Sequence, residues 1–355
     1  MKEIGSEFSL SADRDFYFKR LREIGKSNLF LRCGRDALGF VADLITMRSA
    51  VILMPAYCCD SMVKPFEIRG WNVVYYPVNS DLSVDVSHLL SAYDSYHPDI
   101  LLLMNFFGLS NTKETAGQIK IKWPNINIIE DITHTLFDFE KSFTTQVDFY
   151  VGSIRKWMGI TDGAMVISTK TQMSLLDYRE SDYINLRQKG LDLKEAYNHS
   201  GDPSIKLQFR KMLSDAESTL QDGKKPFLIS PDSHSMLDNL NVGSLKNSRK
   251  GNASFLLQLL KTIPGINYPG NIDQILTITP FSIPVLINNR NMVQKKMAEK
   301  GVYAALLWPL TKKAKEISSV ATLMENKMLS IPVDQRYNAS DMLHIYNIIK
   351  KLVNK

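Results

Sequence analysis

Six short runs of apolar residues, one of them interrupted by Asn127, stand out in the first half of the chain. They occupy positions 51–54, 73–76, 100–104, 126–129, 149–151 and 164–167. Continuous apolar runs are typical of strands in a sheet that is covered on both faces. Between them lie amphipathic stretches at 36–47, 61–69, 87–96 and 113–122, which favour helices. Alternating strands and helices predict an α/β fold with a mostly parallel sheet.

The pattern changes near residue 172. A polar segment of about 172–240 contains a helical stretch at 207–220, and a long helix is predicted at 244–260. A second α/β region follows. We expect strands at 281–287 and 302–307 and helices at 292–300 and 340–353. We therefore expect a large domain over 1–243, which includes an N-terminal segment 1–27 and the polar helical segment. A smaller C-terminal α/β domain is expected over 244–355.

The composition is that of an ordinary globular protein. The 355 residues are 44% hydrophobic and 23% charged, which excludes wholesale disorder. The net charge of +6 is mild, and no basic stripe with interleaved aromatic residues indicates nucleic-acid binding. No apolar stretch approaches the roughly 20 residues of a membrane helix, and the N-terminus does not resemble a signal peptide. We expect a cytoplasmic protein that binds neither nucleic acid nor membrane.

The three cysteines, Cys33, Cys58 and Cys59, do not form the pattern of a disulfide framework. No His and Cys residues occur at the spacing of a zinc site, so no metal is expected.

Candidate chemistry lies in segments that end a predicted strand or begin a predicted helix, where ligands bind in open α/β sheets. CGRDAL at 33–38 opens a helix, and its backbone N–H groups suit a phosphate. An alternative is that Asp36 only caps the helix. IIEDITH at 128–134 presents an acidic pair and a histidine at a strand end, although this aspartate could instead cap the next helix.

The next segment, GSIRKW at 152–157, places a lysine after a small-residue turn, where it could serve as a nucleophile. The alternative is an inert surface lysine. A glycine turn at Asp162-Gly163 follows and leads into the next strand.

Together these segments match the needs of pyridoxal 5'-phosphate (PLP). Lys156 would bind the aldehyde, and Asp131 would pair with the ring nitrogen and keep the ring an electron sink. Ser153 and the helix N-terminus at Gly34 would hold the phosphate.

The same segments resemble fold-type I, aspartate-aminotransferase-like enzymes, and among these the DegT/StrS-type sugar-nucleotide aminotransferases. CGRDAL resembles the family's Ser-Gly-Thr-x-Ala-Leu phosphate turn, and EDITH resembles its Glu-Asp-Ala-Ala-Gln/His pattern. GSIRKW resembles its lysine loop, and LSIPV at 329–333 resembles its Leu-Ser-Leu-Pro-Leu segment. The likeness runs loosely from about residue 28 to 350.

The resemblance implies a homodimeric, PLP-dependent aminotransferase that takes its amino group from glutamate and gives it to a keto-sugar nucleotide. Lys156 would be catalytic, both as the lysine that binds the cofactor and as a general base. His134 would lie near the phenolic oxygen of the ring. The residues implied to bind the cofactor are Gly34, Arg35, Asp36, Tyr57, Cys59, Asp131, His134, Ser153 and Lys156. Arg155 either adds charge at the phosphate or faces solvent.

Two departures from the family pattern leave alternatives open. The family's Pro-Ser-Phe-Thr-aromatic segment appears here as PAYCC at 55–59, so that either Tyr57 or Cys59 faces the ring. The family's Asn-x-Arg segment, which reaches the phosphate from the partner subunit, has no clear match. The alternatives are a PLP enzyme of the same fold with another reaction, such as a lyase, and a non-catalytic protein with a regulatory role.

Overall fold

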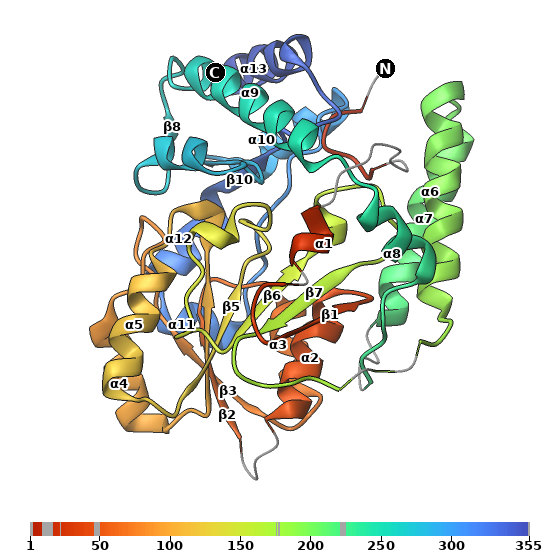
Figure 1. Cartoon of the computed structure of the whole chain (residues 1–355). Coiled ribbons are helices and arrows are strands. Elements are labelled where there is room, and N and C mark those ends of the chain that lie inside the picture. Colours follow the sequence, from red (N-terminus) through yellow and green to blue (C-terminus); the bar gives the residue numbers. More distant parts are fainter. Residues whose placement is uncertain are drawn as a thin grey trace.

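The protein is built on two β-sheets with helices packed around them (Figure 1). The structure, a computed structural model, describes residues 3–8, 17–21, 23–45, 50–174, 176, 178–220 and 225–353. Of the expected N-terminal segment 1–27, positions 1–2, 9–16 and 22 therefore lie outside the described residues. The same holds for the last two positions of the helix expected at 36–47.

The larger sheet has seven strands in the order β1-β7-β6-β5-β4-β2-β3 within the described residues. Its strands are β1 (Ser27–Leu31), β2 (Val51–Pro55), β3 (Asn72–Tyr76), β4 (Ile100–Met104), β5 (Asn127–Asp131), β6 (Phe149–Ser153) and β7 (Ala164–Ser168). The pairs from β3 to β6 are parallel, whereas β7 runs antiparallel to both β6 and β1. The expected α/β fold with a mostly parallel sheet is confirmed, and all six predicted strands are present.

Helices cover this sheet and bury its apolar strands. They are α1 (Tyr17–Leu21), α2 (Gly34–Leu44), α3 (Asp60–Glu67), α4 (Val86–Tyr96) and α5 (Thr112–Lys122). Every residue of β4, β6 and β7 is buried, which explains why these strands appear in the sequence as unbroken apolar runs. Helix α2 packs on α3, and α4 packs on α5. Short 3-10 helices connect some of these elements, namely η1 (Phe106–Gly108), η2 (Phe139–Lys141) and η3 (Ile154–Lys156).

The polar segment after β7 forms a long antiparallel helical hairpin of α6 (Asp182–Ser200) and α7 (Pro203–Thr219). Gly201 ends α6 in the left-handed region, where glycine is favoured. The Asp202 side chain then caps α7, and Pro203 occupies its first turn. In Figure 1 the hairpin stands at one side of the molecule, next to α8 (Pro231–Asp238).

The C-terminal region holds a three-stranded antiparallel sheet and its helices. The elements are α9 (Val242–Leu260), β8 (Ile266–Asn267), η5 (Ile272–Thr277), β9 (Ile283–Ile287), α10 (Arg290–Glu299), α11 (Lys312–Ile317), α12 (Ser319–Lys327), β10 (Met328–Ile331) and α13 (Ala339–Val353). The prediction of a strand at 302–307 is wrong. That run makes only isolated bridges, Ile4 to Val302 and Ala305 to Ser330, because it pairs with a different segment at each end.

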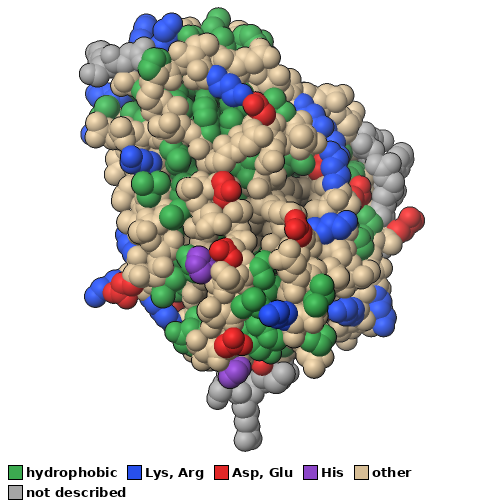
Figure 2. Space-filling model, turned by 90° about the vertical axis from the view of Figure 1, so that its left-hand side faces the viewer, with side chains coloured by type: hydrophobic (Ala, Val, Ile, Leu, Met, Phe, Trp, Pro, Cys, Tyr) green, Lys and Arg blue, Asp and Glu red, His purple; other side chains and the backbone are tan. Residues whose placement is uncertain are grey.

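The surface carries mixed charge where it can be seen in Figure 2. On the side of α4 and α5, basic and acidic side chains are interspersed rather than gathered by sign. Among the helices in the described part of the chain, none combines the length and apolar character needed to span a membrane.

Candidate active site

Lys156 lies at the end of a short loop that follows strand β6. Contacts on both sides hold this loop in place. Near the end of β6, Gly152 packs closely on the next layer, since a Cβ there would lie 2.8 Å from the Leu136 side chain. The backbone N–H groups of Ile154 and Arg155 both donate to the Gly163 carbonyl, at 3.0 and 3.2 Å. The predicted glycine turn thus closes the lysine loop, and the Lys156 side chain is exposed at its end.

Asp131 lies at the end of β5, beside this loop. Strands β5 and β6 are parallel neighbours, with Asp131 opposite Val151, so their carboxyl ends meet at one edge of the sheet. Oδ1 of Asp131 accepts a hydrogen bond from the Thr133 backbone N–H at 2.8 Å. Burial raises the pKa of Asp131, while Thr133 and the charge of Lys156 act in the opposite direction. Lys156 is therefore within electrostatic range of this buried carboxyl.

His134 lies three residues after Asp131 in an aromatic stack. Its ring packs on Phe281 at 4.6 Å and on Phe107 at 4.4 Å between centroids, with Trp308 at 5.8 Å. Burial, reinforced by the charge of Lys156, lowers the pKa of His134 well below its ordinary value, so the imidazole is neutral near pH 7. Its buried Nδ1 has no hydrogen-bond partner among the described residues.

The N-terminus of α2 approaches the lysine loop closely. A Cβ on Gly34 would lie 3.7 Å from Cβ of Ser153, so the predicted phosphate turn and the predicted phosphate-binding serine are neighbours. The Asp36 carboxylate receives two hydrogen bonds from Arg32, at 2.8 and 3.0 Å. The alternative that Asp36 caps α2 is wrong, because the cap position belongs to Cys33, which makes no side-chain capping bond.

Arg35 and Arg155 are bridged by a residue that the sequence did not single out. Glu217 of α7 lies 3.2 Å from Nη1 of Arg35 and 2.9 Å from Nη1 of Arg155. Arg155 therefore turns into the protein, which decides against the reading in which it only faces solvent.

The two candidates for the ring-facing position lie in different surroundings. Tyr57 is buried, and its hydroxyl donates to the Leu307 carbonyl and contacts Sδ of Met328 at 3.2 Å. The hydroxyl end of Tyr57 is thus engaged by the C-terminal region. Cys59 is only partly buried at the start of α3, where its Sγ accepts a hydrogen bond from Ser61 at 3.0 Å. Its neighbour Cys58 is buried and lies within electrostatic range of Asp131.

Arg249 of α9 is a second group that sequence reasoning missed. This fully buried guanidinium donates to the carbonyl oxygens of Trp157 at 3.2 Å, Pro280 at 3.2 Å and Phe281 at 3.0 Å. It also donates from Nε to Gln335 at 2.8 Å, and it lies 4.4 Å from the Trp157 ring centroid. Arg249 therefore joins the residue after Lys156 to the aromatic ring that stacks on His134. No local motif marks it, because its partners are far away in the sequence.

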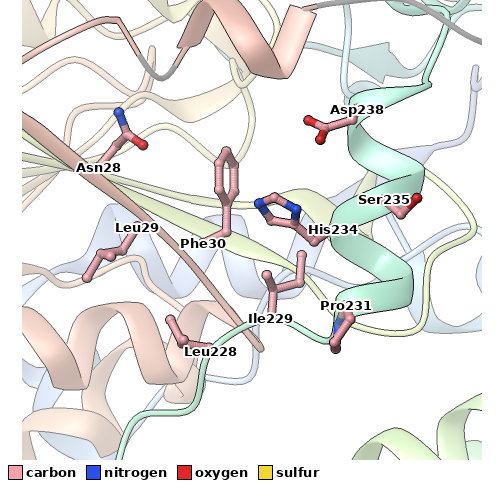
Figure 3. A pocket seen from close by; sticks show the side chains of 9 residues that line it. All are labelled: Asn28, Leu29, Phe30, Leu228, Ile229, Pro231, His234, Ser235 and Asp238. Atoms are coloured by element: carbon pink, nitrogen blue, oxygen red, sulfur yellow. The ribbon is translucent and has the colours of Figure 1, made fainter. Parts of the chain in front are cut away.

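A separate hollow of about 590 Å³ lies at the outer edge of β1. Figure 3 shows the His234 ring from α8 near the Phe30 ring, with Asn28 and Asp238 at the rim. None of its nine lining residues is a predicted site residue, so this hollow is not part of the arrangement around Lys156. Within the described ranges, no group of three or more His, Cys, Asp or Glu side chains could hold a metal ion.

Comparison with known proteins identifies the fold. Neither a family model nor a curated protein matches the sequence. Among solved structures, a DegT DnrJ EryC1 StrS aminotransferase from Brucella abortus is 14% identical, with a TM-score of 0.61 over 96% of this chain and 90% of that one.

Two further solved structures show the same likeness. DesV from S. venezuelae, solved in complex with a ketimine intermediate, is 12% identical with a TM-score of 0.65 over 99% of this chain and 92% of that one. Helicobacter pylori PseC, an aminotransferase involved in the biosynthesis of pseudoaminic acid, is 12% identical with a TM-score of 0.66 over 99% and 93%. The expected aminotransferase fold is therefore confirmed over nearly the whole chain.

Proposed function

We propose that this protein is a PLP-dependent aminotransferase. The observation that carries the proposal is the convergence on Lys156. Three segments of the chain bring a buried carboxyl, a neutral histidine and a glycine turn to one edge of the sheet, where Lys156 acts electrostatically on Asp131 and His134. The structural neighbours support this proposal because they share the fold and include sugar aminotransferases.

The residues present fit the cofactor. The close approach of Gly34 to Ser153 forms a cradle with free space at a helix N-terminus, which suits a phosphate. The backbone N–H groups at Gly34, Arg35 and Asp36 would hold this phosphate together with Ser153. The side chain of Asp36 takes no part, because Arg32 engages it.

The ring would lie between this cradle and β5. Asp131 would accept a hydrogen bond from the protonated ring nitrogen, and Thr133 orients the carboxylate for this purpose. The partnerless Nδ1 of His134 would face the ring oxygen. Cys59 and Tyr57 remain the candidates for the residue against the ring face. When bound, PLP supplies an electron sink for the carbon next to the substrate nitrogen.

Lys156 would bind the cofactor covalently and, once released, would move the proton as general base. Its exposed side chain, at the end of a loop fixed by Gly163, is free to do both. Glutamate is the proposed amino donor and a keto-sugar nucleotide the proposed acceptor, in a cytoplasmic homodimer. The names of the neighbours and the mild net charge of +6 support the choice of an anionic sugar acceptor.

Absorbance spectroscopy on purified protein tests the proposal. With PLP added, the parent should show the violet-edge band of lysine-bound cofactor, and glutamate should bleach this band as the pyridoxamine form appears. Lys156→Ala should lack the band and keep its melting temperature, because the side chain is exposed. Lys122→Ala, at another exposed lysine, is the matched control.

Two results would refute the proposal. An unchanged band in Lys156→Ala would show that another lysine binds the cofactor covalently. A band that survives a wide range of amino donors would favour a non-catalytic protein.

A further inference from the structure

A cluster of arginine residues surrounds the N-terminus of α2 on the side of the helical hairpin. Arg35 comes from α2 itself, Arg155 from the lysine loop, and Arg187 from α6 of the hairpin. All three lie near Glu217 of α7, with Arg187 Nη1 at 3.8 Å from its Oε1. The cluster therefore joins the proposed phosphate turn, the proposed catalytic loop and both helices of the hairpin.

The cluster holds more positive than negative charge. Three guanidinium groups face Glu217 and one further carboxylate, Glu7, which lies 3.2 Å from Arg187 Nη2. Burial would raise the pKa of Glu217, but Arg155, Arg35 and Arg187 lower it below its ordinary value, so this carboxylate is charged. Among the described residues, three guanidinium groups thus face two carboxylates, which leaves one basic side chain in excess.

Several buried donors in this cluster have no partner among the described residues. They are Nε of Arg155, Nε of Arg187 and the hydroxyl of Tyr183, and they outnumber the one buried acceptor of the cluster that makes no hydrogen bond, Oε1 of Glu217. Arg187 is only 3% exposed and Tyr183 is 0% exposed. The Tyr183 hydroxyl lies within electrostatic range of Arg155, Arg187, Glu217 and the α2 cap residue Cys33. Buried donors without acceptors are costly, so an arrangement of this kind indicates a missing anion.

We propose that the hairpin binds the cofactor phosphate within the same chain that carries Lys156, through Arg187 and Tyr183 acting with Arg155 and Arg35. This inference rests on the proposed function. A phosphate dianion offers several acceptor oxygens, and arginine forks match its geometry. One of its negative charges would balance the excess basic side chain, and the backbone N–H groups at the N-terminus of α2 would face the other. The phosphate oxygens would accept from the partnerless donors, while Glu217 keeps the guanidinium groups oriented.

This arrangement differs from the family pattern, in which an Asn-x-Arg segment of the partner subunit reaches the phosphate and for which this sequence has no clear match. Here α6 and α7 lie against α2 of their own chain. Tyr183, Ala216 and Leu220 of the hairpin region pack around Cys33 in one buried apolar cluster. In this cis arrangement, the hairpin of each chain serves the phosphate site of that same chain.

Comparing PLP with pyridoxal, which lacks the phosphate, isolates the proposed contact. Dissociation constants would be measured from the violet-edge band for the parent, Arg187→Met, Tyr183→Phe and the control Lys189→Met. The control removes the same charge from an exposed position of the same helix.

We expect Arg187→Met to weaken PLP about 10- to 100-fold and Tyr183→Phe about 5-fold, with pyridoxal binding and the control changed less than about 2-fold. Equal PLP affinities for Arg187→Met and Lys189→Met would overturn the inference. If Arg187→Met fails to fold, Tyr183→Phe decides, because it removes one hydroxyl and leaves the packed ring. A parent that shows no band with either compound would instead refute the proposed function.

A mixing experiment separates cis from trans binding. Lys156→Ala and Arg187→Met chains would be co-expressed and purified together, and PLP affinity measured from the band. If the hairpin acts within its own chain, no site has both groups and tight binding stays lost. Recovery of tight binding in the mixture would show that the hairpin serves a partner, and would overturn the cis assignment.

Discussion

Glu130 offers a test of the electrostatics behind the site. It precedes Asp131 in β5, and its side chain is fully buried. Oε1 accepts hydrogen bonds from Thr112 at 2.7 Å and Asn105 at 3.4 Å, whereas the buried Oε2 has no partner among the described residues. Burial raises the pKa of Glu130 from its ordinary 4.5 to about 7, and the charge of Asp131 adds to the effect.

The sign and size of the effect on stability follow from this value. Since the folded-state pKa lies above the unfolded one, the native protein binds this proton more tightly. The stabilisation is fully present below pH 4.5 and is lost as pH rises through about 7. The difference of about 2.5 pKa units corresponds to about 3 kcal/mol, at about 1.36 kcal/mol per unit. Glu130→Gln, which imitates the protonated side chain, should abolish this loss.

Denaturant unfolding at pH 5 and pH 8 measures the effect. We expect Glu130→Gln to match the parent within about 1 kcal/mol at pH 5 and to exceed it by about 2–3 kcal/mol at pH 8. Glu140→Gln, at an exposed glutamate, controls for the change in net charge and should follow the parent at both values. If the parent and Glu130→Gln differ by the same amount at pH 5 and pH 8, the assignment of a raised pKa to Glu130 is wrong.

Two further substitutions test the site. Asp131→Asn should retain PLP but slow the half-reaction with glutamate by roughly 100-fold or more, because an amide cannot keep the ring nitrogen protonated. If stopped-flow absorbance gives a rate like that of the parent, the ring nitrogen does not face Asp131. Arg249→Met removes the donor to the carbonyl oxygens of Pro280 and Phe281, and leaves the Trp157 carbonyl with Gln335 as its remaining donor. We therefore expect a loss of about 2–4 kcal/mol in denaturant unfolding and a slower half-reaction. Arg249→Lys should recover part of the stability. Equal stability of the parent, Arg249→Met and Arg249→Lys would contradict the idea that the Arg249 guanidinium holds the lysine loop in place.

The sheet was largely predictable because its strands are covered on both faces. Six strands carry apolar runs, so that burial alone marks them in the sequence. Strand β1 was missed since its first residues, Ser27 and Asn28, are polar and only partly buried at the edge of the sheet. The run at 302–307 gave the opposite error, because its apolar side chains pack without a continuous strand partner.

The site residues also fall into two groups, those that a local sequence pattern marks and those that it does not. Asp131, His134, Ser153 and Lys156 lie in short local motifs, so the sequence alone could indicate them. Arg249 and Glu217 could not be found in this way. Each residue lies more than fifty positions after Lys156 in the sequence, and neither position has an unusual local pattern. Only the three-dimensional packing of α7 and α9 reveals them.

The contacts that Glu217 of α7 and Arg249 of α9 make with the lysine loop have a consequence for synthesis of the protein on the ribosome. The last strand of the large sheet is complete at Ser168, but Glu217, Arg249 and Gln335 emerge only afterwards. A nascent chain can therefore assemble its central sheet, and close the lysine loop on Gly163, well before these later residues add their contacts to that loop. Vitamin B6 loading should accordingly be a late event, which a series of stalled translation products of increasing length would reveal.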